Sequence, residues 1–153
     1  TDSEGNIINH ECSSNVLYNE GANITRDLLM NGSASNITGI SLCNASGSGV
    51  GSCGTPIANS LANFTALQGC GMGNITNAAV VFPRSHSNLG QTNVSITYTF
   101  TNTCSSTAPS PKMSTNVTRL ITQGGVPFAG NAFTLANLSQ NDQLLINWTI
   151  NVQ

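Results

Sequence analysis

The chain has 153 residues, which is enough for one domain with a single hydrophobic core. Hydrophobic residues make up 39% of it but charged residues only 7%, against about 25% in an average soluble domain. The net charge of −2 argues against binding to nucleic acid or anionic lipid, and no apolar run reaches the roughly 20 residues that cross a bilayer. We therefore expect a folded protein that binds no nucleic acid and does not span a membrane.

The few charged residues gather near the start of the chain. Five of the six carboxylates precede residue 28, and only Asp142 follows. This difference in composition predicts an N-terminal tail over residues 1–22 and a head over residues 23–153. Because the head has few groups that titrate in acid, its stability should depend weakly on pH.

Alternating apolar and polar residues predict several short strands. The pattern is clearest over 92–102 and 143–153, where apolar residues alternate with Thr, Asn and Ser. One helix is expected near 56–68, where Pro56 suits the first helical position. Strands separated by polar turns predict an all-β fold, a β-sandwich. The other strands are expected at 36–43, 76–83, 116–123 and 131–138, and the turns at 47–54, 85–91, 104–112, 124–130 and 139–142.

Acceptor triplets for N-linked sugars, Asn-x-Ser/Thr, occur ten times along the chain. Random order of the same residues would give about five. In eight of them the middle residue is large and apolar, so on a strand the Asn faces solvent while its neighbour faces the core. This density predicts an extracellular, heavily N-glycosylated protein. The acceptors are Asn23, Asn31, Asn36, Asn44, Asn63, Asn74, Asn93, Asn116, Asn137 and Asn147.

Five cysteines in an extracellular chain are expected to form mostly disulfides. Cys53 with Cys70, which flank the expected helix, is the first choice, and Cys43 with Cys104 is the second. The remaining Cys12 makes the number odd. One cysteine therefore either stays free or joins two chains.

No group of residues with catalytic spacing is found. The two histidines, His10 and His86, lack the neighbouring acids that would orient a general base. The segment 49–54 matches G-x-G-x-x-G, but no acidic residue follows about 20 positions later, as a dinucleotide site needs. We expect no enzymatic activity, no cofactor other than covalent glycans, and no metal.

Taken together, the charged N-terminal segment, the dense acceptor triplets and the alternating strand after "LANLSQNDQ" resemble the subunit of an archaeal thread-type surface filament. The resemblance covers most of the chain. It implies an immunoglobulin-like or pilin-like β-sandwich, similar to bacterial type I pilins, with an extended N-terminal segment. It also implies a homopolymer joined head to tail by donor-strand complementation, in a cell-surface appendage that serves adhesion to surfaces or other cells, or biofilm formation.

The physical basis of such assembly is an incomplete sandwich, whose open strand edge a neighbour's extended segment fills. Trp148, the only tryptophan, is the candidate for one wall of that groove. The sequence equally allows the segment to pair within its own sandwich as a first strand. The apolar residues available for donation are Ile7, Ile8, Val16, Leu17 and Tyr18.

A monomeric cell-surface adhesin or carbohydrate-binding module on the same sandwich is the alternative function. Such a module needs exposed aromatic side chains, for which Tyr18, Tyr98 and Trp148 are the candidates. The last two lie on predicted core faces, which disfavours this alternative.

Overall fold

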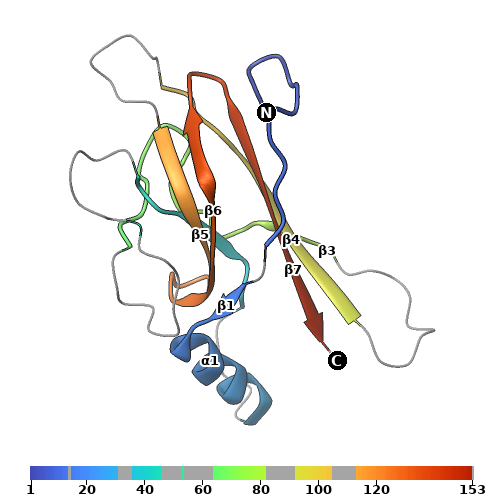
Figure 1. Cartoon of the computed structure of the whole chain (residues 1–153). Coiled ribbons are helices and arrows are strands. Elements are labelled where there is room, and N and C mark those ends of the chain that lie inside the picture. The colour runs from blue at the N-terminus through green and yellow to red at the C-terminus, as the bar shows by residue number, and fades with distance from the viewer. Residues whose placement is uncertain are drawn as a thin grey trace.

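The computed structural model describes residues 1–13, 15–30, 36–45, 53, 64–81, 92–104 and 113–152. Figure 1 shows the described elements, most of which are strands. In chain order they are β1 (Val16–Leu17), α1 (Asn19–Met30), β2 (Gly39–Leu42), β3 (Ala79–Val81), β4 (Thr92–Thr101), β5 (Met113–Ile121), β6 (Pro127–Leu138) and β7 (Gln143–Val152).

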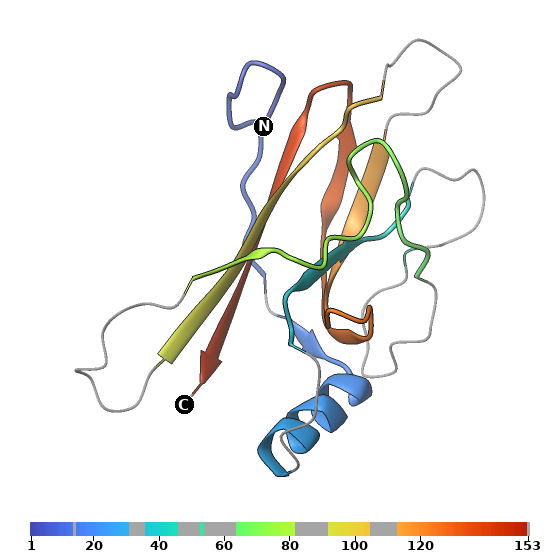
Figure 2. The ribbon, with the colours of Figure 1, turned by 180° about the vertical axis from the view of Figure 1, so that it is seen from behind.

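The strands form two antiparallel sheets with one core between them. Four strands pair in the order β1-β6-β5-β2, and three in the order β3-β4-β7. The turn after β6 carries the chain from the first sheet to the second, and the sheets spread apart toward the opposite end, where α1 lies (Figures 1 and 2). The prediction of an all-β fold is confirmed. The core consists of Ile40, Leu42, Leu67, Met72, Ala78, Ile96, Phe100, Leu120, Ala129, Leu138, Ile146 and Trp148.

β4 and β7 follow the alternation that the sequence predicts. They pair along their whole length, with Ile96 opposite Trp148 and Phe100 opposite Leu144. The first three of these side chains are buried, whereas Asn147, next to Trp148 in the chain, is exposed. Burying one apolar face while the other stays polar is what stabilises a two-sheet packing.

The remaining strands are present with shifted ends. β2 and β3 lie within the expected segments, but β5 begins three residues before 116 and β6 four residues before 131. The expected turn over 124–130 is therefore shorter, because Pro127 already lies opposite Ile121 of β5. Proline is tolerated there because it occupies the first position of the strand.

The helix expected near 56–68 is wrong for the part of that segment that is described. Residues 56–63 lie outside the described residues, and Phe64 and Ala66 form antiparallel bridges with Cys53 and Cys43. Pairing with these distant cysteines overrides the local helical signal. No helix in the described ranges is long and apolar enough to cross a membrane.

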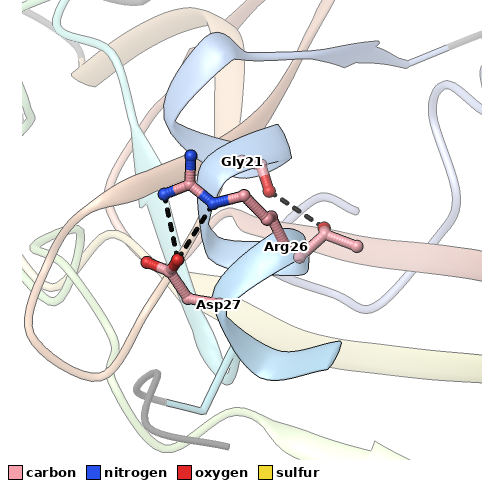
Figure 3. Close-up of polar contacts among 4 residues, drawn as sticks. Gly21, Arg26 and Asp27 are labelled. Carbon is pink, nitrogen blue, oxygen red and sulfur yellow. Dashed lines mark hydrogen bonds and ion pairs between the residues drawn. The ribbon is translucent and has the colours of Figure 1, made fainter. Parts of the chain in front are cut away.

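A helix that the sequence did not predict, α1, follows β1 directly. Within it, the Thr25 hydroxyl donates to the Gly21 carbonyl at 2.9 Å, and the Arg26 guanidinium pairs with Asp27 at 3.0 Å (Figure 3). The only signals for it are Glu20 in the first turn and the four-residue spacing of Ile24 and Leu28. The expected boundary between tail and head, after residue 22, falls inside α1.

A glycine allows α1 to lie close to β6. Gly21 is buried, and a β-carbon at this position would lie 2.1 Å from the carbonyl oxygen of Phe128. The backbone of Tyr18, just before the helix, donates to the same carbonyl at 3.0 Å. Only a residue without a side chain fits at position 21 in this packing.

The disulfides are Cys43–Cys53 and Cys70–Cys104, so both predicted pairings are wrong although the four cysteines are the predicted ones. Cys43 meets Cys53 because the chain at 53 and 64–66 returns beside the end of β2. Cys70 lies beside the end of β4, where its carbonyl accepts a hydrogen bond from the N–H of Thr103. Cys12 is a free, exposed thiol.

Candidate functional site

The N-terminal segment, which we define as residues 1–17, lies against its own chain. In Figure 1 it runs from the N-terminus near the β6–β7 turn down to β1. Val16 and Leu17 pair antiparallel with Gly130 and Ala129 of β6. This arrangement is the intramolecular one that the sequence left open beside donation to a neighbour.

A buried amide on β6 holds the segment just before β1. The Oδ1 atom of Asn131 accepts a hydrogen bond from the Ser13 hydroxyl at 2.5 Å. Its Nδ2 donates to Asn15 Oδ1 at 2.6 Å and to the Ser13 carbonyl at 3.3 Å. Asn131 is only 9% exposed, whereas Ser13 and Asn15 lie at the surface. We call these three residues the Asn131 network.

Polar contacts at two further places hold the rest of the segment. The Glu11 carboxylate accepts a hydrogen bond from the Thr134 N–H at 3.0 Å, and the Thr1 carbonyl accepts one from the Gln143 N–H at 2.8 Å. Between these contacts, Ile7 is 75% exposed and its neighbour Ile8 is 68% exposed. The segment is therefore attached by polar groups while its most apolar side chains remain in water.

Asp2 closes a turn at the start of the segment. The backbone N–H groups of Glu4 and Asn6 donate to Asp2 Oδ1 at 3.0 and 2.9 Å, and Asn6 Nδ2 donates to Asp2 Oδ2 at 3.0 Å. These bonds, that of the Asn6 side chain above all, stabilise the charged carboxylate and lower the pKa of Asp2 below its ordinary value.

Tyr18, one of the predicted tail residues, belongs to the head. It is 2% exposed, and its hydroxyl accepts a hydrogen bond from Arg119 Nε at 3.2 Å. The Arg119 guanidinium also lies over the Tyr18 ring, 5.2 Å from its centre. Of the other predicted tail residues, Ile7, Ile8 and Leu17 are exposed and Val16 is half-buried.

Among the described residues, few pair with the edge of β7 that faces away from β4. Within the described residues, Gln143 is the one residue of β7 whose backbone bonds to a segment on that side, at Thr1. Trp148 lies in the middle of this strand, and it is 3% exposed. Its indole Nε1 has no hydrogen-bond partner among the described residues. A buried donor without an acceptor costs about 1–3 kcal/mol.

The structure describes seven of the ten acceptor asparagines with their side chains. Asn44 and Asn116 are half-buried, and Asn116 Oδ1 is buried without a partner among the described groups. Asn31 and Asn63, together with the side chain of Asn93, lie outside the described residues. The exposed acceptors are Asn23, Asn36, Asn74, Asn137 and Asn147.

The alternation of exposed acceptor and inward apolar neighbour holds at four of these exposed positions. Ile37 and Ile75 pack against the core, and Leu138 and Trp148 belong to it. Asn23 is the exception, because it lies on α1, where residues two apart do not share a face. Glycosylation itself stays a prediction.

No chemistry-bearing cluster emerges from the described residues. They contain no group of three or more His, Cys, Asp and Glu side chains that could hold a metal ion. His10 is exposed on the N-terminal segment. His86 and, apart from Cys53, the glycine-rich segment 49–54 lie outside the described residues.

The fold and the disulfides define an all-β protein of two antiparallel sheets. Its two disulfides are compatible with an extracellular protein. No protein-family model, no curated protein and no solved structure matches this chain.

Proposed function

We propose that this protein is a structural subunit of an extracellular, heavily N-glycosylated filament. Its head is an immunoglobulin-like or pilin-like sandwich, and the subunits join head to tail by donor-strand complementation. In this assembly the N-terminal segment of one subunit leaves its own chain and fills the open edge of the next. The resulting homopolymer serves adhesion or biofilm formation at the cell surface, as the resemblance to archaeal thread subunits implies.

The observation that carries the proposal is the mismatch between the segment and its own chain. Ile7 and Ile8 are exposed although, among the described residues, the outer edge of β7 is paired only at Gln143. Consecutive side chains point to opposite faces of a strand, so an added strand would bury one of the two isoleucines in the neighbour's core, which would contribute about 1.5–3 kcal/mol. Strand addition would also satisfy the outer backbone groups of β7 that have no partner among the described residues.

The positions of the acceptor asparagines are compatible with this assembly. The N-terminal segment contains no acceptor triplet, and Asn147 lies on the exposed face of β7, not on the core face that carries Trp148. Glycans on the exposed acceptors would replace the charged side chains that the surface lacks and keep the polymer hydrated.

A carbohydrate-binding module is less well supported. Tyr18 and Trp148 are buried, and Tyr98 is half-buried against Phe100, with ring centres 4.8 Å apart. None of these aromatic side chains forms an exposed sugar-stacking platform.

The test compares two double variants of the full chain by negative-stain microscopy. Ile7→Asp with Ile8→Asp should stay monomeric, because charged residues cannot enter a neighbour's core. Leu29→Asp with Met30→Asp on α1 is the matched control, because these side chains are 79% and 78% exposed. The control should form filaments as the wild type does.

Both double variants should keep the wild-type unfolding midpoint, since all four side chains face solvent in the isolated chain. Wild-type preparations that contain only uniform globular particles would overturn the proposal. Filaments from the Ile7/Ile8 variant would overturn the donor role of the segment.

A further inference from the structure

Several of the hydrogen bonds that hold the N-terminal segment gather at one side chain of β6. Asn131 is bonded to both Ser13 and Asn15, and Ser13 Oγ also approaches the Ala132 carbonyl at 3.4 Å. On the outer edge of β6, the next contact is the Glu11 carboxylate at the Thr134 N–H. The attachment is thus a cluster of specific polar contacts and not an apolar interface.

The chemistry of the amide suits it to hold this particular segment. One carboxamide offers an acceptor and two donor hydrogens, and here the acceptor receives the Ser13 hydroxyl while the NH₂ group serves Asn15 and the Ser13 carbonyl. Its near-complete burial keeps water from competing for these bonds. A carboxylate at the same place would lose both donors.

These contacts do not bury the apolar part of the segment. Ile7 and Ile8 lie between the contact at Glu11 and the contact at Thr1, and both are mostly in water. An intramolecular complement that had reached its most stable packing would bury at least one of them. The segment is therefore held in place without being fully packed.

We propose that the Asn131 network is an autoinhibitory latch. It keeps the N-terminal segment on its own chain until the segment transfers to a neighbour, and its opening limits the rate of that transfer. This inference rests on the proposed function, because it assigns the regulation of the same segment. The latch delays assembly without altering the final polymer, in which Ile7 or Ile8 enters a neighbour's core.

The experiment measures assembly of the full chain from purified monomer by light scattering, with microscopy of the product. Asn131→Asp and, separately, Ser13→Ala with Asn15→Ala remove latch bonds. The second variant changes only exposed side chains, so it should fold even if Asn131→Asp does not. Thr134→Ala is the control. It changes an exposed side chain of β6 but keeps the backbone N–H that donates a hydrogen bond to the Glu11 carboxylate.

Latch variants should assemble roughly 5–30-fold faster than wild type, the factor that corresponds to one or two lost hydrogen bonds. The control should match wild type. In the monomer, hydrogen exchange at the Thr134 amide should rise by a similar factor in the latch variants, since release of the segment frees this N–H from Glu11.

Two results would overturn the latch, and they are distinguishable. Filaments that form at equal rates in wild type and latch variants would refute the latch and leave the proposed function intact. Absence of filaments from every variant, wild type included, would refute the filament itself and with it the latch.

Discussion

The guanidinium carbon of Arg119 lies 3.9 Å from the centre of the Phe64 ring. Arg119 lies on β5, and Phe64 is bridged to Cys53. The Arg119 side chain also donates a hydrogen bond to the Tyr18 hydroxyl, so it connects Phe64 with Tyr18. Three segments that are distant in sequence meet at one cation.

Replacement of Arg119 by Met should lower the free energy of unfolding by about 1–2 kcal/mol, because the charge over two rings is lost while most of the apolar stem remains. Arg119→Lys should recover part of this, since an ammonium has no planar face to stack. Urea denaturation measures the effect. Arg26→Met on the exposed side of α1 is the control and should change stability by less than about 0.5 kcal/mol.

Replacement of Gly21 by Ala should destabilise the protein by about 1–3 kcal/mol, because the new β-carbon would collide with the Phe128 carbonyl oxygen. Helix propensity alone would favour Ala by up to about 1 kcal/mol, so the two effects have opposite signs. Asn23→Ala, at an exposed position of the same helix, should be neutral or stabilising in unglycosylated protein. Thermal unfolding that ranks the two variants in the reverse order would contradict the close packing of α1 on β6.

Peptide mapping without reduction should recover Cys43 linked to Cys53 and Cys70 linked to Cys104, with alkylation restricted to Cys12. Removing either disulfide by double alanine substitution should lower the free energy of unfolding by about 2–4 kcal/mol. The loss should be larger for Cys70–Cys104, because this disulfide joins residues 34 positions apart, whereas Cys43–Cys53 joins residues 10 positions apart. A peptide that links Cys53 to Cys70 would contradict the structure.

Stability should change little between neutral pH and pH 3, because the described residues after Asp27 include one carboxylate side chain, that of Asp142. Asp2 makes the folded state less stable as the pH falls. Its folded-state pKa is depressed, so its contribution is present above the unfolded-state pKa and disappears as pH falls through the folded-state value.

Asn6→Ala should raise the pKa of Asp2 toward its ordinary value, since the Asn6 side chain is the largest cause of the depression. An NMR titration of the Asp2 carboxyl group measures this. Acid unfolding with a midpoint at about pH 4 would contradict the expectation that stability depends weakly on pH.

Intact glycopeptide mass spectrometry of protein from its native cells should find sugars at Asn36, Asn74, Asn137 and Asn147, all of which are exposed. Asn116 should remain unmodified, because its side chain is half-buried on β5. Full occupancy at Asn116 with none at Asn147 would contradict an acceptor pattern governed by exposure.

The two strongest strands could be predicted because their information is local. In β4 and β7 every second residue is apolar, and the two-residue period of a strand alone decides which side chains are buried. The exposed acceptors Asn137 and Asn147 follow from the same period. The acceptor motif is local as well, because it consists of three consecutive residues.

α1 was not predicted, because its sequence is ambiguous. It contains Gly21 and the β-branched Ile24 and Thr25, which favour helix weakly. The helix is stabilised by the close approach of Gly21 to Phe128, and these two residues are more than a hundred positions apart in the sequence.

The sequence by itself determined the all-β fold, the position of its main strands and the outward direction of most described acceptors, because each depends on neighbouring residues. Only the tertiary structure decided which cysteines pair, where the helix forms and where the N-terminal segment lies. The bonds of Asn131 to Ser13 and Asn15 join opposite ends of the chain. Such contacts depend on how the whole chain packs, and no local pattern encodes them.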